Sequence, residues 1–469
     1  MKSTRPVFFP IVLLLLLAPG SAAAQIKLPS SESATLSNGM RVVLSPRKDI
    51  PMVTVRLLFR GGAEADPPGK AGLGDLTGEL LQRGAGSLDA AAFAERLDSL
   101  GAELAIDTTA QATTVAMEFL SKDAGAALAL LAEAVAHPVF AETEVKKALA
   151  ESIDAVRAGK DDPGSALRSY ATAMMFGPAH PYGRVVDELS LARIGRDDIV
   201  SHHRRYFGGK NLIAVVVGDF APAPMRALVE KTLGAIDAGE AHTWLAPLPA
   251  PTHSQSRLLL IDKPDATQTY FTIMMPGIQR GHPDRGGLWL VNTLFGERFT
   301  SMLNEALRIN SGLTYGASSR IQLNRLPGAI TLSSFTKNET TVEAIDLALK
   351  VLRRLREKGI DAAQLASAKA YIKGIYPTDN LETSGQLAAV LGDLELFGLN
   401  RGEVDDLFSR LDAVNPAQAS ELARRYFVET NLQFCLVGKA SDIKSKIGKY
   451  SHAIRVVPIT EPGFNVPVF

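Results

Sequence analysis

The sequence lacks disulfide-forming cysteines, an excess of charge and long internal apolar runs. Its one cysteine, Cys435, excludes a disulfide within the chain, and its apolar context LQFCLVG predicts a buried structural thiol. The 50 lysines and arginines balance 50 acidic residues, with no basic stripe or tail. The sequence therefore has no electrostatic footprint for nucleic acid or an acidic membrane. After the first 25 residues, no apolar run approaches the roughly 20 residues that span a bilayer.

Histidine is scarce and wrongly spaced for a hydrolytic zinc site. Such a site needs three ligands, usually including histidine, an open position for water and a base beside it. None of the eight histidines forms an H-x-x-x-H or H-x-x-H pair. His202 and His203 are adjacent on a predicted helix and point about 100° apart, so they cannot bind one ion. We expect them to flank a solvated helix face.

The first 25 residues have the order of a secretory signal peptide. Lys2 and Arg5 precede an apolar run from Val7 to Ala18, and the small residues Ala22 to Ala24 follow. The alternative, an uncleaved anchor, is disfavoured because this run is too short to span a bilayer. We expect residues 1–24 to be removed, with cleavage near Gln25. The mature protein is then exported, soluble and most simply periplasmic.

The chain contains the same pattern twice. RRYFGGKNLIAVVVGD begins at Arg204 and RRYFVETNLQFCLVGK begins at Arg424, each a helix end, a turn and a β-branched strand. The offset of about 220 residues is too long for a solenoid repeat of about 20 to 50 residues. We predict two homologous domains in tandem, at 30–235 and 258–460. The Ala- and Pro-rich segment 236–257 between them has no helical or strand period and reads as a linker.

Within each half, predicted hairpins alternate with long Ala- and Leu-rich helices. AAAFAERLDSLGA predicts a helix closed by Gly101, and ELAIDTTAQATTVAMEFL predicts a hairpin. This mixture favours an α+β fold, in which each domain has a largely antiparallel sheet with helices packed on one face.

The segment AGLGDLTGELLQRGAG, from Ala71 to Gly86, resembles the zinc motif of the pitrilysin/insulinase family of zinc peptidases, G-x-x-H-x-x-E-H-x-x-x-x-G. The resemblance extends over nearly the whole mature chain, and it implies a fold of two similar α+β domains. In this register Asp75 and Glu79 replace the two zinc histidines, and Gly78 replaces the general-base glutamate. Glu151 lies near the family's third ligand, but its register is uncertain and we do not assign it. The resemblance thus implies that this chain binds no zinc.

Two alternatives exist for the carboxylates at the motif positions. Asp75 and Glu79 share a helix face at i, i+4 and could hold a hard cation loosely. Solvated helix carboxylates are the favoured interpretation.

A second family signature is present in GERFTSMLNEALRINSGLTYGASS, which resembles F-x-S-R-L-x-x-x-L-R-x-x-x-G-L-x-Y. Arg308 and Tyr315 match it, whereas Met302 stands where arginine is frequent. The resemblance implies that this arginine holds the substrate backbone and that the tyrosine hydroxyl steadies the scissile carbonyl. The spacing predicts a helix that ends at Gly312, followed by a strand carrying Tyr315. The apolar stripe of that helix is expected at Phe299, Met302, Leu303, Ala306 and Leu307.

The alternative is a purely structural pair, in which Arg308 binds a surface carboxylate and Tyr315 packs in the sheet. The hairpin at 101–119 resembles the family's substrate-pairing hairpin, but without zinc we expect it to be only sheet.

Three functions remain open. The first is the zinc-lacking subunit of a two-chain peptidase, which supplies Arg308 and Tyr315 to a homologous partner that carries the zinc. The second is a structural or peptide-binding protein without a catalytic role. The third is an independent hydrolase that uses Asp75 and Glu79.

Overall fold

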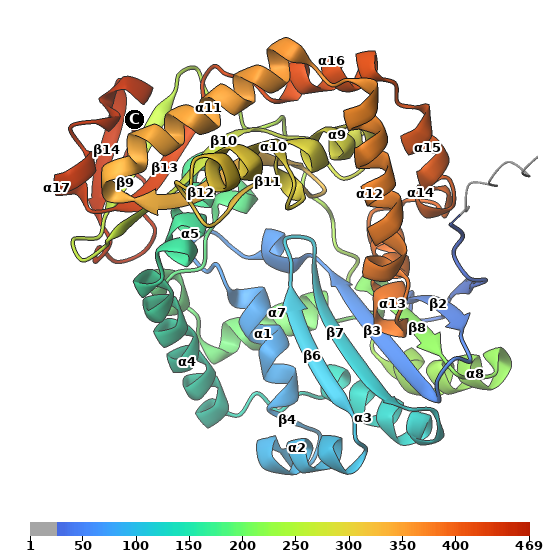
Figure 1. Ribbon diagram of the computed structural model, residues 1–469. Helices are drawn as coiled ribbons and strands as arrows, with labels where there is room; N and C mark the ends of the chain where they lie inside the picture. Colours follow the sequence, from blue (N-terminus) through green and yellow to red (C-terminus); the bar gives the residue numbers. More distant parts are fainter. Residues whose placement is uncertain (1–25) are drawn as a thin grey trace, which may run out of the picture.

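The computed structural model describes residues 26–469, so the expected signal peptide lies outside the described residues. These residues form two six-stranded sheets (Figure 1). In spatial order, the first sheet consists of β1 (Glu32–Thr35), β2 (Arg41–Pro46), β8 (Leu212–Gly218), β3 (Met52–Arg60), β7 (Ala112–Leu120) and β6 (Glu103–Thr108). The second consists of β11 (Ala317–Leu323), β12 (Pro327–Lys337), β10 (Gln268–Pro276), β13 (Gln433–Gly438), β9 (Arg257–Asp262) and β14 (Ala453–Pro458).

Most neighbouring strands in both sheets are antiparallel. The exceptions are the parallel pairs β2–β8, β9–β13 and β9–β14. The predicted hairpin at 101–119 consists of β6 and β7, and β6 is the edge strand of its sheet. Two very short strands, β4 (Gly84–Ala85) and β5 (Leu88–Asp89), pair separately from the sheets.

Helices account for most of the remaining residues. In the first half they are α1 (Leu73–Glu79), α2 (Ala90–Ser99), α3 (Ala124–Ala136), α4 (Glu142–Asp161), α5 (Pro163–Phe176), α6 (Glu188–Leu191), α7 (Arg196–Tyr206) and α8 (Pro222–Thr232). In the second half they are α9 (Arg285–Asn292), α10 (Met302–Asn304), α11 (Thr341–Lys358), α12 (Ala362–Asn380), α13 (Ser384–Leu396), α14 (Gly402–Asp405), α15 (Leu407–Ala413), α16 (Pro416–Tyr426) and α17 (Ala440–Ile443). The α+β prediction is confirmed.

The first half has its main core on one face of its sheet. Alternate residues of the strands, such as Val55 and Leu57 of β3 and Val216 of β8, are fully buried against helices of the same half. The second half repeats this arrangement with Ile273 of β10 and Leu436 of β13. The period of two in the strands explains how one face serves this core.

The opposite face of each sheet is covered by a helix from the other half. Helix α13 packs on β3 and β8 of the first sheet, and α5 packs on β10 and β13 of the second (Figure 1). Because both faces are buried, β8 has no exposed residue and Cys435 of β13 is fully buried, as predicted. Burial raises the pKa of its thiol. The prediction of helices on one face did not anticipate this exchange, which joins the halves through two apolar cores.

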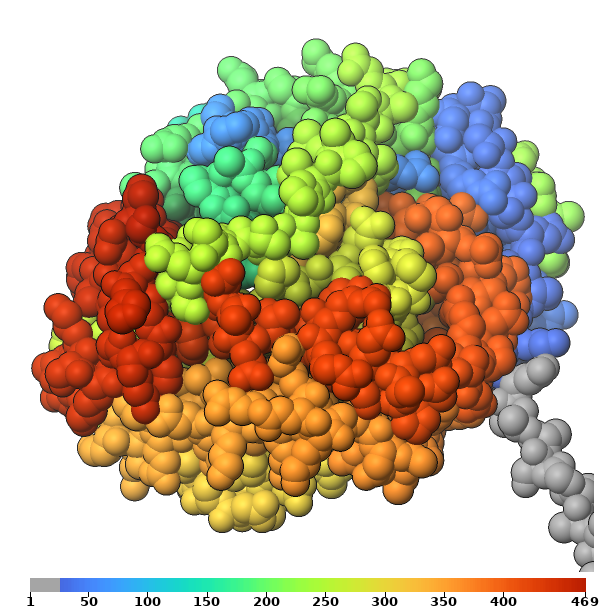
Figure 2. All heavy atoms as spheres, turned by 90° about the horizontal axis from the view of Figure 1, so that it is seen from above, coloured from blue at the N-terminus to red at the C-terminus, as the bar shows by residue number. Residues whose placement is uncertain are grey.

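The segment that connects the halves has neither helix nor strand from residue 236 to residue 256. Seen from above in Figure 2, this yellow-green segment lies on the surface between the first half, in blue and green, and the second, in orange and red. The domain limits stay predictions, because α5 and α13 each pack on the sheet of the other half. Among residues 26–469, no helix combines the length and the apolar character required to cross a bilayer.

Candidate functional site

Helix α1 carries the positions that resemble the zinc motif. It begins after Gly72, whose φ of 97° lies in the left-handed region that favours glycine. The Asp66 carboxylate accepts hydrogen bonds from the Gly72 and Gly74 N–H groups, both at 2.8 Å. Asp66 is only 2% exposed, and burial raises the pKa of its carboxyl to about 7 despite these hydrogen bonds. The start of α1 is therefore fixed by a buried carboxylate that forms no ion pair within residues 26–469.

Glu79, at the position of the second zinc histidine, is bound by an arginine. The guanidinium of Arg83, one turn further along the chain, forms an ion pair with Glu79 and a 2.7 Å contact with Glu151 of α4. A second carboxylate of α4, Glu144, lies 3.7 Å from the same guanidinium. A single arginine thus joins three carboxylates from two helices. The i, i+4 spacing of Arg83 from Glu79 is the sequence signal for this pair, which was not predicted.

Asp75, at the position of the first histidine, faces other acidic groups. Loss of surrounding solvent raises the pKa of Asp75, and the negative charges of Glu79 and Asp107 act in the same direction. Among the described residues, no group of three histidine, cysteine or acidic side chains is arranged to hold a metal ion. The residues at the motif positions do not fit a catalytic zinc, since the glutamates that could contribute ligands are engaged by Arg83.

Gly78, at the position of the general base, lies where a side chain does not fit. A Cβ atom there would lie 2.8 Å from Cγ2 of Thr113 and 3.1 Å from Cγ2 of Ile106. These residues belong to β7 and β6, against which α1 packs. The position of the base is thus filled by the sheet.

The expectation that His202 and His203 flank a solvated face is wrong. His202 is 6% exposed, and burial lowers its pKa to about 3. His203 is partly buried and stacks on Phe207, with Nε2 2.7 Å from the backbone oxygen of Val135. His202 faces α1, which packs on α7, and His203 faces Val135 of α3 and the Phe140 ring, so two neighbouring elements close sides of α7 that its charged sequence had suggested to be open.

The segment with Arg308 is anchored by buried leucines. Ser301 caps α10 by accepting a hydrogen bond from the Asn304 N–H, and Leu303 and Leu307 are fully buried. The chain continues as a π-helix, η8 (Glu305–Asn310), which places Arg308 in its last turn as predicted. The predicted stripe is wrong at its first position: Phe299 precedes the helix and is 60% exposed.

Arg308 stacks on an aromatic ring. Its guanidinium carbon lies 4.7 Å from the centre of the Phe299 ring, a cation–π arrangement. No ion pair within the described residues involves Arg308. The guanidinium therefore keeps its capacity for hydrogen bonds to another molecule.

Tyr315 does not lie on a strand, contrary to the prediction. It precedes β11, which begins at Ala317, and its side chain is 81% exposed. The backbone around it is held firmly: the Thr314 hydroxyl donates to the Gly316 carbonyl at 3.0 Å, and the Thr336 hydroxyl donates to the Leu313 carbonyl at 2.7 Å. A fixed turn thus projects a phenol into solvent.

Arg308 also lines a cavity of about 830 Å³, and a second cavity has a volume of about 950 Å³. We call the first the Arg308 cavity. It lies between α5 and the strands β10, β11 and β12. Gly316 and Ala317, the two residues that follow Tyr315, also line it. The second, the inter-half cavity, has walls from both halves, including Arg56 and Gln111 from the first.

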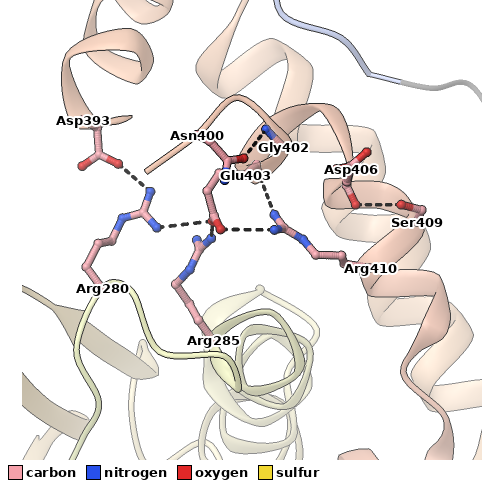
Figure 3. Close-up of polar contacts among 9 residues, drawn as sticks. All are labelled: Arg280, Arg285, Asp393, Asn400, Gly402, Glu403, Asp406, Ser409 and Arg410. Carbon is pink, nitrogen blue, oxygen red and sulfur yellow. Dashed lines mark hydrogen bonds and ion pairs between the residues drawn. The ribbon is translucent and has the colours of Figure 1, made fainter. Parts of the chain in front are cut away.

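Two of the arginines in the wall of the inter-half cavity, Arg280 and Arg285, are paired with acids (Figure 3). Arg280 binds Asp393, and Arg285 binds Glu403, which also lies 3.1 Å from Arg410. Burial lowers the pKa of Arg285 to about 10, and the charges of Arg280 and Arg410 act in the same direction. This network connects the loop before α9 and the start of α9 to α13, α14 and α15. The positive charges of its arginines are therefore neutralised by acidic groups of the protein itself.

Comparison with known proteins identifies similar chains. The model described as Insulinase (Peptidase family M16) matches residues 41–176, and the one described as Peptidase M16 inactive domain matches residues 193–372. An uncharacterized zinc protease of Bacillus subtilis, YmxG, is 23% identical over 397 residues, covering 84% of this chain and 95% of that protein. A Helicobacter pylori protein named non-peptidase homolog YmxG is 22% identical over 389 residues, covering 83% of this chain and 89% of that protein.

The fold is also shared with a solved structure. The crystal structure of a peptidase M16 inactive domain from Pseudomonas fluorescens matches with a TM-score of 0.81 at 21% identity, covering 87% of this chain and 98% of that one. Both halves of the chain match models of one family, and the residues at 75, 78 and 79 depart from its zinc motif. The chain therefore belongs to the insulinase family, peptidase family M16, as a member that lacks the family's zinc motif.

Proposed function

We propose that this chain is the zinc-lacking subunit of a two-chain peptidase, in which Arg308 and Tyr315 act at the zinc site of a homologous partner. The observation that carries the proposal is the exposure of Tyr315, 81% on a turn whose backbone is fixed by hydrogen bonds. A tyrosine stabilises a fold mainly by burying its ring, and Tyr315 buries little of it. The alternative of a purely structural pair is not favoured, since Arg308 has no carboxylate partner among the described residues and Tyr315 is outside the sheet.

The chemistry of the pair suits peptide hydrolysis. A phenol hydroxyl can donate a hydrogen bond to the oxyanion that develops as the scissile carbonyl is attacked. The planar guanidinium of Arg308 can donate two parallel hydrogen bonds to a substrate carbonyl or carboxylate. Stacking on Phe299 holds the guanidinium in place before substrate arrives. Zinc, supplied by the partner, would activate the attacking water.

In this proposal the chain alone is inactive. Asp75 and Glu79 are disfavoured as an independent hydrolytic pair, because Glu79 is bound by Arg83 and Asp75 has acidic neighbours. The order of charged, apolar and small residues at positions 1–24 supports export, with the complex assembled in the periplasm.

Reconstitution tests the proposal. The purified chain, a zinc-bearing homologous subunit and their mixture are assayed for cleavage of unfolded peptides, with size-exclusion chromatography to follow assembly. We expect cleavage only by the mixed complex. Arg308→Ala should raise KM as well as lower kcat, and Arg308→Lys should restore part of the loss, because an ammonium cannot reproduce the guanidinium fork.

The competing structural or peptide-binding function predicts a different result. If the complex assembles and its kinetics are the same with Arg308→Ala and Tyr315→Phe as with the wild type, the pair has no catalytic role.

A further inference from the structure

The Arg308 cavity combines an apolar wall with an excess of positive charge. Its volume, about 830 Å³, falls within the range of about 300–1,000 Å³ that is typical of ligand pockets. Helix α5 and strands β10 and β12 supply its apolar side chains, which include Leu167, Ala171, Met175, Phe176, Met274 and Phe335. The wall can therefore bury apolar parts of a ligand.

The charged side chains of this wall are four arginines and one glutamate. Arg168 comes from α5, Arg298 and Arg308 flank α10, and Arg320 comes from β11. The glutamate, Glu297, accepts hydrogen bonds from the Thr293 hydroxyl at 2.9 Å and the Trp289 indole at 3.2 Å.

None of the four arginines forms an ion pair within the described residues. Two of them are held by hydroxyl groups instead: Arg168 donates to Ser165 at 2.9 Å and Arg298 donates to Ser367 at 2.8 Å. Nε of Arg298 is buried without a partner. Arg280 and Arg285 of the inter-half cavity are instead bound by Asp393 and Glu403, whereas Arg320 lines both cavities. The positive charge of the Arg308 cavity is thus available to a ligand.

We propose that the Arg308 cavity binds acidic peptide segments, with glutamate or aspartate side chains against the arginines and apolar side chains against α5 and β10. A polyanion such as nucleic acid is disfavoured, because its recognition uses an extended basic surface, whereas these arginines surround an apolar pocket. The inference names the substrate class of the proposed peptidase site and rests on that function for its catalytic meaning. Its physical basis, charge complementarity, applies to the isolated chain as well.

Binding to the purified chain alone tests the inference. Three fluorescein-labelled peptides of equal length are compared by anisotropy: alternating Leu and Glu, Leu and Gln, and Leu and Lys. We expect the Glu peptide to bind about tenfold more tightly than the Gln peptide, and the Lys peptide to bind most weakly. The preference should disappear in about 1 M NaCl, where the Debye length is about 3 Å. Equal affinity of the Glu and Gln peptides at low salt would overturn the inference.

Matched variants locate the site. The variant Arg168→Gln, which changes an arginine that lines only the Arg308 cavity of the two, should weaken binding of the Glu peptide about threefold while leaving the Gln peptide unchanged. Arg354→Gln is the control, because Arg354 is an exposed arginine of α11 that does not line the cavity. An equal loss in the control would mean that net charge, and not this cavity, binds the peptide, and would also overturn the inference.

The assay separates this inference from the proposed function. Selective binding without cleavage by any mixed complex would retain the acidic-peptide site and contradict the peptidase proposal. Cleavage by the mixed complex together with equal binding of all three peptides would do the opposite.

Discussion

The region around Arg83 and the region around Arg308 use the same residue type in opposite ways. The side chain of Arg83 is 18% exposed and binds Glu79, Glu144 and Glu151, so its positive charge is neutralised within the fold. Arg308 stacks on an exposed phenylalanine and has no acidic partner among the described residues.

The difference extends to the surroundings of each arginine. Next to the Arg83 cluster, Gly78 has no room for a side chain, whereas Tyr315, near Arg308 in the sequence, is largely in solvent. Ion pairs that close a site contribute to stability, and unpaired donors at an open site are available to bind another molecule. We infer that the first region has become structural and that the second has kept the capacity for function.

The largest effect should come from the open region. Tyr315→Phe removes one hydroxyl from an exposed ring, so assembly with the partner should be intact while kcat falls by about 10² to 10³, the usual result of losing one oxyanion donor. Steady-state peptide cleavage by the mixed complex measures it. The control is Tyr371→Phe, which removes a hydroxyl from another exposed tyrosine, 36% exposed on α12. Similar kinetics of the two variants would contradict the proposed role.

Restoring the motif in the closed region should fail. The triple variant Asp75→His, Gly78→Glu, Glu79→His should bind no stoichiometric zinc and should lose about 3 kcal/mol of stability, because the new side chain at 78 overpacks against Thr113 and Ile106. Elemental analysis after dialysis and urea unfolding are the measurements. The double variant that retains Gly78 is the control and should be destabilised much less. One zinc per chain in the triple variant would show that the site is latent rather than lost.

Removing the cation of the closed region should have a moderate effect. Arg83→Met leaves three neighbouring glutamates without their shared partner, and we expect a loss of about 2 kcal/mol in the free energy of unfolding. Arg353→Met is the comparison, because Arg353 is 59% exposed in its pair with Glu429 and should contribute less than about 0.5 kcal/mol. Equal losses would mean that Arg83 behaves as an ordinary surface ion pair.

The smallest effect should be a pH dependence at Asp66. Its folded pKa, about 7, lies above its ordinary value of 3.8, so the folded state binds the extra proton between about pH 4 and pH 7. The stability that Asp66 contributes should therefore be greatest at the acid end of this window and decline as the pH rises through 7. In thermal unfolding, the advantage of wild type over Asp66→Asn should be larger at pH 5 than at pH 8. A constant difference would mean that the pKa of Asp66 is not raised.

The family, the α+β class and the loss of the zinc motif could be predicted from the sequence because they depend on local patterns. The residues at 75, 78 and 79 are read directly, and the paired RRYF blocks, 220 positions apart from Arg204 to Arg424, indicate duplication. The predictions for Phe299, Tyr315 and the His202–His203 pair were wrong for a common reason. Apolar spacing identifies a helix face or strand, but it does not tell where the element begins or which neighbour covers it.

The sequence by itself determined the elements, their duplication and the absence of a zinc motif, because hydrophobic period and residue identity are local properties of the chain. Only the tertiary structure decided the exchange of α5 and α13 between the sheets, the capture of Glu79 and Glu151 by Arg83, and the gathering of Arg168 with Arg298, Arg308 and Arg320. These contacts join residues far apart in sequence, and burial of apolar surface between the halves determines which of them meet.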